Sequence, residues 1–401
     1  MKILYTNFHS GDGGGHTTYI LNLVRVLSRR HQVAVAAPRS SRLYQSARNM
    51  PGVDAFDFEF RNTLGCMTGT ALTLRRLIEL NGYDVVHVNG SADHRVAGLA
   101  TLGMSRKRPR IVFTKHNDLP ASGLGTWLKG TLGTDSVICV SEYTRRFLTQ
   151  TVYGRKVMRV VHHGVDLSRF IPARASAVNR TRQFWFPELP DDTLVVGSTA
   201  GMDDNKSWLD MVAAVALLPE AQRRRIRIAL AGHLPNERQR ARVAELGMTD
   251  QVIYAGLLRD VRSLVTAFDV GFVLSQRETL SFACREMMAM GKPMIVSDAG
   301  GLPENISAGV DGWIVPPRGH AHLAQLLEHL LDNRPEVARA GAAARTKSEQ
   351  QFSMETFAER TEAVYQECLR RKGSTVSSQS RARAGVLRRA IRAALTSLPP
   401  I

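Results

Sequence analysis

The sequence predicts an α/β fold with two Rossmann-like domains that face each other across a cleft. The chain opens with a strand, a glycine-rich loop, a helix and a second strand, which is how a parallel sheet begins. A second alternation of short apolar strands and helical segments starts near residue 193. Residues 172–192 interrupt the pattern with three prolines and several arginines. A chain of 401 residues is long enough for two separate cores.

The N-terminal domain is predicted over residues 1–172. Residues 1–6 form its first strand, residues 11–16 a glycine-rich turn and residues 33–37 its second strand. Backbone amides of Gly13, Gly14 and Gly15 at the start of a helix favour a phosphate group. The glycines lack the G-x-G-x-x-G spacing and no acidic residue ends the second strand, which argues against a dinucleotide site. A tight turn that needs glycine for its geometry alone is the alternative.

Four more strands are predicted in this domain, over residues 84–89, 110–114, 136–140 and 157–162. Polar side chains lie at their ends, namely His87, His116 and Ser141, and Ser141 can also cap the helix that follows it. Each residue alone is more often structural. Together they indicate a binding cleft, because the carboxyl ends of parallel strands lie at one edge of a sheet.

Residues 173–192 are predicted to be an inter-domain linker without helical periodicity, and residues 193–350 a second Rossmann-like domain. Its strands are expected over residues 193–198, 227–232, 251–256, 267–274, 293–297 and 312–316. The adjacent pair Asp203 and Asp204 is expected to cap a helix rather than to bind a metal ion. Helical periodicity continues over residues 345–369, and a C-terminal helix over 351–371 is expected to return towards the N-terminal domain.

Two glutamates follow the apolar run 267–274. Glu278 is expected in the loop at the carboxyl end of that strand, and Glu286 inside a helix that starts near Ser281. A carboxylate accepts hydrogen bonds from two donors at once, so this pair suits a ligand rich in hydroxyl groups. A solvated helix face is the alternative.

The chain is strongly basic, with a formal net charge of +17. Eight basic residues lie between Arg370 and Arg392, and no acidic residue follows Glu367. Within the tail, residues 372–401, apolar residues from Val386 to Leu395 fall on one helical face and arginines on the other. Such a helix fits an anionic membrane surface; a helix docked on its own protein, or disorder, is the alternative. Nucleic acid is a weak candidate partner, because the basic clusters lack aromatic residues on which bases stack.

The remaining features indicate a cytosolic protein. Cys66, Cys139, Cys284 and Cys368 are far apart without metal-ligand spacing, which predicts reduced cysteines. We expect no signal peptide, and no apolar run is long enough to span a bilayer.

Up to about Leu369 the chain resembles the GT-B glycosyltransferases, in particular glycosyltransferase family 4, whose members are retaining enzymes that use nucleotide-activated sugars. The most specific part is Glu278-x7-Glu286, followed by Met288-Ala289-x-Gly291-Lys292-Pro293 and then by two glycine motifs. These motifs are Gly300-Gly301-x-Pro303-Glu304 and Gly309-x-Asp311-Gly312. Supporting matches are the early glycine loop, Thr114-Lys115-His116, Val140-Ser141 and His163-Gly164-Val165-Asp166-x-x-x-Phe170.

The resemblance implies a role for each matching residue. Glu286 binds the ribose hydroxyls of the donor, and Glu278 binds a hydroxyl of its sugar. Lys206 and the loop Gly13, Gly14 and Gly15 contact the diphosphate, and His116 lies beside the sugar. The backbone of Thr279, Leu280, Ser281 and Phe282 also lines the donor site, while Gly232 and the turn after Gly256 frame the base. Because a lysine and backbone amides stabilise the departing phosphate, no metal or other cofactor is expected.

The sequence departs from the family pattern at the donor site. Gly201 stands where many members have an arginine five residues before the lysine; Arg277 or Arg285 is a candidate replacement. Thr279 and Ser281 replace two common glycines, with Leu280 between them in the usual aromatic place. Asn117 follows His116 where an aspartate is common. We expect an altered pocket for the donor sugar.

These observations favour a retaining, metal-independent glycosyltransferase that moves a sugar from a nucleotide sugar to a glycan or glycolipid. The basic charge favours an anionic acceptor, as in lipopolysaccharide or other cell-envelope biosynthesis, and peripheral contact of the tail with the inner membrane surface. One alternative is a GT-B protein that binds nucleotide or glycan without transferring sugar. A nucleotide-sugar epimerase on the same fold is another.

Overall fold

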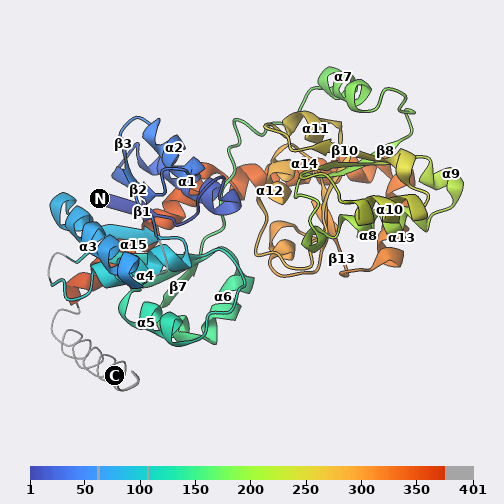
Figure 1. The fold of residues 1–401 in the computed structure, drawn as a ribbon. Helices are drawn as coiled ribbons and strands as arrows, with labels where there is room; N and C mark the ends of the chain where they lie inside the picture. Colours follow the sequence, from blue (N-terminus) through green and yellow to red (C-terminus); the bar gives the residue numbers. More distant parts are fainter. Residues whose placement is uncertain (61–63, 106–107, 375–401) are drawn as a thin grey trace.

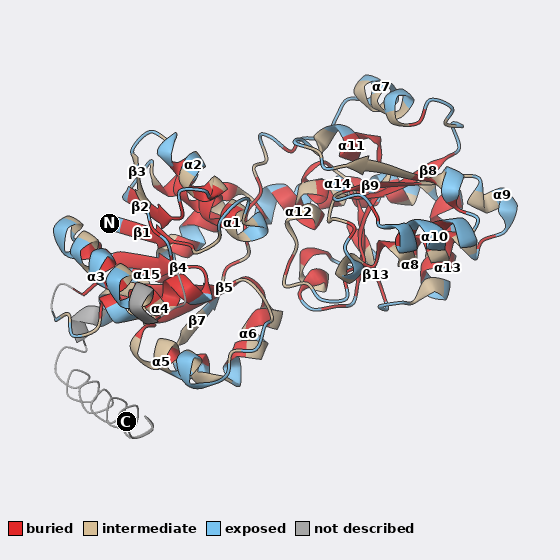
Figure 2. Cartoon of the chain, in the orientation of Figure 1, coloured by how far each residue is buried: buried red, intermediate tan, exposed pale blue. Residues whose placement is uncertain are grey.

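The computed structural model describes residues 1–60, 64–105 and 108–374, with the side chains of 64–66 and 372–374 excepted. It contains two parallel sheets in two lobes that lie side by side (Figure 1), so the predicted fold class is confirmed. Buried residues concentrate along the strands of both sheets, and the outer faces of the helices are exposed (Figure 2). The tail predicted to contact membrane lies outside the described residues from 375 onwards.

The N-terminal sheet has the strand order β3-β2-β1-β4-β5-β6-β7, with every neighbouring pair parallel. The strands are β1 (Lys2–Thr6), β2 (Gln32–Ala37), β3 (Val53–Asp57), β4 (Val85–Val88), β5 (Arg110–Lys115), β6 (Ser136–Cys139) and β7 (Val157–Val160). The helices are α1 (Gly14–Leu27), α2 (Arg42–Arg48), α3 (Leu64–Asn81), α4 (Ser91–Ala100), α5 (Leu124–Leu132) and α6 (Glu142–Thr149), with a 3-10 turn at Val152–Arg155. Strand β3 was not predicted from the sequence, because it is a half-buried edge strand whose two aspartates weaken its apolar pattern.

The C-terminal sheet has the order β10-β9-β8-β11-β12-β13, and its pairs are also parallel. The strands are β8 (Leu194–Ser198), β9 (Ile226–Ala231), β10 (Val252–Gly256), β11 (Val270–Val273), β12 (Met294–Ser297) and β13 (Gly312–Val315). The helices are α8 (Trp208–Ala216), α9 (Glu220–Arg223), α10 (Glu237–Glu245), α11 (Arg262–Ala267), α12 (Phe282–Ala289), α13 (His320–Asp332) and α14 (Arg334–Gln351). Short 3-10 turns cover Asp204–Lys206, Thr249–Gln251 and Leu302–Asn305.

Residues 173–192, predicted from the sequence to be an inter-domain linker, are partly helical. They contain helix α7 (Ala175–Trp185), which packs on α11 of the C-terminal domain. None of the residues of α7 is buried. Weak burial explains why the apolar periodicity of this helix is faint in the sequence.

The predicted helical run 345–369 is divided in two at Phe352. Helix α14 ends there, and α15 (Met354–Ser374) crosses to the N-terminal lobe, where it packs on α1 (Figure 1). The Tyr365 hydroxyl on α15 bonds the Tyr5 hydroxyl at 2.9 Å and His87 Nδ1 at 2.6 Å. The last helix of the chain is therefore part of the N-terminal core.

This network corrects the prediction for His87. Its side chain is fully buried between β4 and α15, and its Nε2 lies 2.6 Å from the Thr114 hydroxyl. Burial keeps the pKa of His87 low, at about 3, so the ring is neutral. His87 therefore helps to hold α15 and does not line the cleft.

Three cysteines, Cys139, Cys284 and Cys368, are buried and free. Among the described residues, no helix is both long and apolar enough to cross a membrane.

Candidate active site between the two domains

The glycine loop lies at the carboxyl end of β1 and begins helix α1. Gly13 and Gly14 have left-handed backbones, with φ of 66° and 52°. A Cβ on Gly13 would lie 2.2 Å from the Thr17 hydroxyl, and a Cβ on Gly15 would meet the ring of Phe282 at 3.6 Å. Gly13 and Gly14 are thus suited to the left-handed backbone of the loop. Gly15, at the other end of the loop, lies close to Phe282 of the C-terminal domain.

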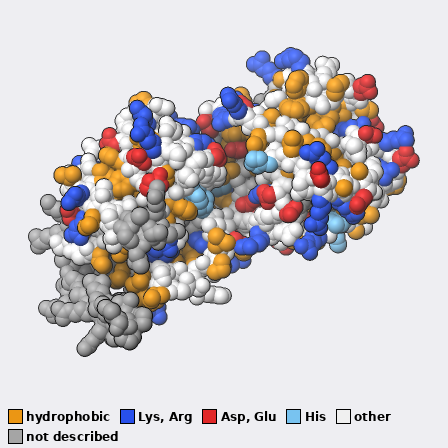
Figure 3. Space-filling view, viewed as in Figure 1, with side chains coloured by type: hydrophobic (Ala, Val, Ile, Leu, Met, Phe, Trp, Pro, Cys, Tyr) orange, Lys and Arg blue, Asp and Glu red, His pale blue; other side chains and the backbone are white. Residues whose placement is uncertain are grey.

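His116 follows β5 on the N-terminal side of the cleft. Its Nε2 lies 3.0 Å from Asn89 Oδ1, and its ring packs against the ring of His16, centroid to centroid 4.4 Å. His16 in turn lies 3.2 Å from His9, Nδ1 to Nε2. Burial, assisted by the neighbouring histidines, lowers the pKa of His116 well below its usual value, so this ring is neutral near pH 7. Figure 3 shows histidine side chains in the hollow between the two lobes.

Glu278 and Lys206 meet on the C-terminal side of the cleft. Lys206 lies in the 3-10 turn after β8, and its Nζ is 2.7 Å from Glu278 Oε2. Both side chains keep about a fifth of their surface exposed, at 21% and 19%. The pair therefore holds an accessible cation and an accessible carboxylate side by side at the ends of β8 and β11.

Two glycines after β12 hold the loop that carries Glu278. Gly301 N donates to the Glu278 carbonyl at 2.9 Å. A Cβ on Gly300 would lie 2.0 Å from the Glu278 carbonyl oxygen, and one on Gly301 would lie 2.0 Å from that of Thr279. The absence of a side chain on Gly300 and Gly301 thus lets their backbone lie close to the carbonyl groups of Glu278 and Thr279, where any other residue would clash.

The loop between the two glutamates contacts the N-terminal domain. The Thr279 hydroxyl donates to the His116 carbonyl at 2.8 Å, and the ring of Phe282 stacks on His163 with centroids 3.6 Å apart. Leu280 is buried, and its carbonyl accepts from Asn305 Nδ2 at 2.7 Å. This loop therefore joins the two halves of the cleft.

Ser281 has a positive φ of 106°, which is rare for a residue with a side chain. It precedes α12, and its hydroxyl accepts from Cys284 N at 3.3 Å. The hydrogen bond offsets part of the backbone strain. The common family glycine at this place fits the same conformation without strain.

Glu286 lies in α12, where burial raises its pKa to about 7. Arg169 opposes this shift through its positive charge. Among the described residues, its carboxylate has neither a hydrogen bond nor an ion pair. A half-buried carboxylate of this kind is suited to accept hydroxyl groups of a ligand.

A pocket of about 370 Å³ opens at the carboxyl ends of β8, β9 and β10. It is lined by Thr199, Ala200, Gly201, Met202, Asp203, Ala231, Gly232, His233, Leu257, Leu258 and Val261. The structure thus brings Gly232 together with the turn after Gly256, as expected for a base pocket. Because Gly201 has a φ of 100°, an arginine there would be strained. Neither Asp203 nor Asp204 caps a helix as predicted: Asp203 makes no cap hydrogen bond, and Asp204 Oδ1 accepts from Gln239 at 2.9 Å.

Both candidates for the missing arginine have partners within the protein. Arg277 pairs with Asp118 across the cleft, with NH2 to Oδ1 2.9 Å. Arg285 is fully buried and donates to Asn305 Oδ1 at 2.8 Å and to the His163 carbonyl at 2.6 Å. Arg277 therefore joins the two domains across the cleft mouth, and Arg285 supports the residues beneath Phe282.

Glu304 makes a further inter-domain contact, and no role for it was predicted from the sequence. Its carboxylate accepts from the amides of Glu142 and Tyr143 at 2.7 and 2.8 Å, at the start of α6. These hydrogen bonds and His162 lower the pKa of Glu304 despite its burial. Glu304 thus supplies a negative charge to the positive end of a helix in the other domain. The buried Ser141 caps this helix at Thr144 N, and its hydroxyl lies 3.0 Å from the place of a Cβ on Gly301 of the other domain.

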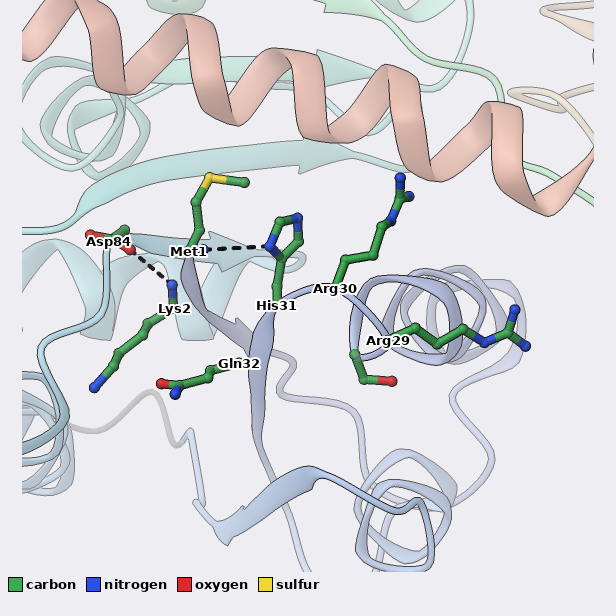
Figure 4. Close-up of a pocket in the computed structure, with 8 residues that line it drawn as sticks. Met1, Lys2, Arg29, Arg30, His31, Gln32 and Asp84 are labelled. Atoms are coloured by element: carbon green, nitrogen blue, oxygen red, sulfur yellow. Dashed lines mark hydrogen bonds between the residues drawn. The ribbon is translucent and has the colours of Figure 1, made fainter.

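A larger pocket, of about 500 Å³, lies elsewhere, at the amino ends of β1, β2 and β4 (Figure 4). It is lined by Met1, Lys2, Ser28, Arg29, Arg30, His31, Gln32 and Asp84. In parallel α/β sheets, ligands bind at the carboxyl ends of the strands. We therefore place the functional site between the domains and not in this pocket.

Comparison with known proteins agrees with this arrangement. Residues 13–169 match the family described as Glycosyltransferase Family 4, and residues 179–347 match Glycosyl transferases group 1. EpsD of Bacillus subtilis is 28% identical over 307 residues, which cover 73% of this chain and 78% of EpsD. The lipopolysaccharide core biosynthesis mannosyltransferase LpsB of Rhizobium meliloti is 24% identical over 66% of this chain and 74% of LpsB.

Solved structures share the fold. Anabaena HepE in complex with UDP superposes with a TM-score of 0.79 at 19% identity, over 92% of this chain and 100% of HepE. The two facing sheets define the GT-B fold, and the match to Glycosyl transferases group 1 defines the class as glycosyltransferase. The matches to both halves place it more narrowly: the chain belongs to glycosyltransferase family 4.

Proposed function

We propose that this protein is a retaining glycosyltransferase that moves a sugar from a nucleotide sugar to a glycan or glycolipid of the cell envelope. One observation carries the proposal. The Thr279–His116 contact brings the Glu278 loop of the C-terminal domain, where Glu278 pairs with Lys206, against His116 of the N-terminal domain. Gly15 of the glycine loop lies beside Phe282 of the same Glu278 loop. We propose that the groups expected to contact a nucleotide sugar act together in the cleft at this contact.

The proposed roles follow from the chemistry of each group. The base occupies the pocket around Gly232, and the Glu286 carboxylate accepts the ribose hydroxyls. Lys206 and the amides of the glycine loop bind the diphosphate, where negative charge grows as the sugar leaves. Glu278 orients a sugar hydroxyl. Neutral His116 lies beside the sugar as a hydrogen-bonding group.

In the proposed reaction the acceptor oxygen bonds to the anomeric carbon on the face from which the diphosphate leaves. The bond from that carbon to the phosphate oxygen breaks, and the departing phosphate takes the acceptor proton. No protein base is required. We propose that the reaction needs no metal ion, because Lys206 and the backbone amides supply the positive charge. A chelator such as EDTA should leave the rate unchanged.

The cell-envelope role rests on two supports. LpsB is named for lipopolysaccharide core biosynthesis, and the net charge of +17 suits an anionic acceptor. We place the protein in the cytoplasm, with the basic tail contacting the inner membrane surface. HepE has been solved with UDP-glucose, so UDP-sugars are the first donors to test.

Product analysis tests the activity. The protein is incubated with a nucleotide sugar and an oligosaccharide acceptor, and the anomeric configuration of the product is read by NMR. Transfer with the donor configuration kept is expected. An inverted product would refute the retaining reaction. Binding without transfer would favour a nucleotide-binding protein, and a converted sugar in the absence of acceptor would indicate an epimerase.

A further inference from the structure

Two lysines near the cleft are held by neutral groups alone. Lys115 Nζ donates to Asn117 Oδ1 at 3.0 Å and to the Leu119 carbonyl at 2.8 Å. Lys129 Nζ donates to the Ser91 hydroxyl at 2.7 Å. Within the part of the chain that the structure describes, neither ammonium forms an ion pair with a carboxylate. Lys115 is buried and Lys129 is half-buried, so each ammonium has lost water without gaining a carboxylate partner, and an anionic ligand would offset that loss.

The charges around these lysines are mainly positive. Burial, together with the charges of Arg95 and Lys115, lowers the pKa of Lys129 to about 8, while Asp93 opposes this shift. Burial also lowers the pKa of Lys115 to about 8, against the charge of Asp118. Asp118 is itself paired with Arg277. The net charge around Lys115 and Lys129 is therefore positive, which favours an anionic ligand.

The lysines lie at the edge of the sheet where an acceptor would approach. Lys115 ends β5 and immediately precedes His116, and Lys129 lies on α5 and contacts the first residue of α4. Both helices follow strands at the carboxyl edge of the N-terminal sheet (Figure 1). An anion bound here would lie on the N-terminal side of the cleft, one residue from His116 in the sequence.

Apolar side chains lie exposed in the same segment. Leu119 is 56% exposed, Leu124 73% and Trp127 40%. Leu124 and Trp127 are three residues apart on α5 and so share a helix face. No acidic residue lies between Asp118 and Asp135 in the sequence. The segment thus combines an exposed apolar surface with two cations, the pattern that a lipid bearing a phosphate group would match.

We propose that Lys115, Lys129, Leu119, Leu124 and Trp127 form an acceptor site for a phosphate-bearing lipid, with the phosphate on the lysines and the apolar chain on the other three. These five residues, called the acceptor face below, specify the acceptor of the proposed function, and their assignment rests on that function. Within the proposed function, the preferred acceptor is thereby a glycolipid whose lipid part carries a phosphate group.

Calorimetric titration with dihexanoyl phosphatidic acid, kept below its micelle concentration, tests the proposal on the full chain. Dihexanoyl phosphatidylcholine and inorganic phosphate serve as comparison ligands. The phosphatidic acid is expected to bind more tightly than either. Lys115→Met and Lys129→Met should each weaken it about tenfold, since each removes a charge-assisted hydrogen bond. Arg76→Met, an exposed cation on α3, is the matched control and should change nothing.

The contribution of the apolar residues of the acceptor face to lipid binding is tested separately. Replacing both Leu124 and Trp127 by Ser should weaken phosphatidic acid binding but leave inorganic phosphate binding unchanged, and Leu80→Ser on α3 should alter neither. Equal affinity for phosphatidic acid and inorganic phosphate would overturn the lipid assignment. Affinity of Lys129→Met within twofold of the unsubstituted protein would overturn the phosphate site.

Two measurements separate this proposal from the proposed function. Thermal shifts with a nucleotide sugar should be the same for Lys129→Met and the unsubstituted protein, which also shows that the variant folds. A nucleotide-sugar shift without phosphatidic acid binding refutes the acceptor face alone. Binding that occurs only to vesicles containing phosphatidic acid, and survives in Lys129→Met, assigns the contact to another surface and also refutes it.

Discussion

Lowering the pH through 7 should release the donor, because Glu286 must be ionised to accept two ribose hydroxyls. Burial raises the pKa of this carboxyl to about 7 in the free protein. Hydroxyls that donate to the carboxylate favour its charged form, so binding pulls the pKa down. Affinity is therefore full above the free pKa and is lost as the pH falls below it. About nine in ten molecules are ionised at pH 8 and about one in ten at pH 6, which predicts a loss of about tenfold.

Calorimetric titration with a nucleotide sugar measures this change. The intact sugar ester is preferred to the free nucleoside diphosphate, because its phosphates do not titrate in this range. The pKa values of His16 and His116 are lowered by burial, so these rings stay neutral across the window. Glu286→Gln is the control: it keeps the size of the side chain and cannot titrate. It should bind weakly and with no pH dependence between pH 6 and 8.

Two results would refute this reasoning. One is unchanged affinity for the donor between pH 6 and 8 in the unsubstituted protein. The other is a full pH dependence in Glu286→Gln, which would assign the titration to a different group.

Three further substitutions test the cleft. Ser281→Gly should raise the free energy of unfolding, measured by urea titration, by about 1 kcal/mol. Glycine adopts the positive φ without strain, and only a weak N-cap hydrogen bond is lost. A lower free energy of unfolding would show that the backbone of Ser281 is not strained. Gly301→Ala should leave the protein folded by circular dichroism but lower the transfer rate about 100-fold, because its Cβ displaces Thr279; a normal rate would show that the loop position is unimportant. Arg277→Ala should change nucleotide affinity less than twofold, since its partner is Asp118, and a tenfold loss would restore its role at the diphosphate.

Much of the fold was predictable because apolar strands alternate with glycine loops and helices. The C-terminal motif was also specific: Glu278, Glu286 and the Gly300-Gly301 pair fell where strand ends and close backbone contacts place them. The edge strand β3 and the helix α7 were missed because neither buries a clear apolar face. Apolar periodicity in a sequence arises because one face of an element is buried. Elements that are partly exposed on all faces therefore lack a periodic pattern.

Contacts between the domains could not be predicted from local patterns. Asp118 and Arg277, or Glu304 and the start of α6, are far apart in the sequence and meet only after both domains fold. His87 shows the reverse case. Its place at a strand end suggested a cleft residue, but α15 returns from the far end of the chain and covers it.

The most direct test of the central claim is a screen of nucleotide sugars by thermal shift, run in parallel on the unsubstituted protein and Glu286→Ala. A ligand that binds the native state raises its melting temperature. We predict that at least one nucleotide sugar stabilises the unsubstituted protein and that the same compound leaves Glu286→Ala unchanged. Equal stabilisation of both proteins would contradict the ribose assignment, and no stabilisation by any nucleotide sugar would contradict the proposed donor site.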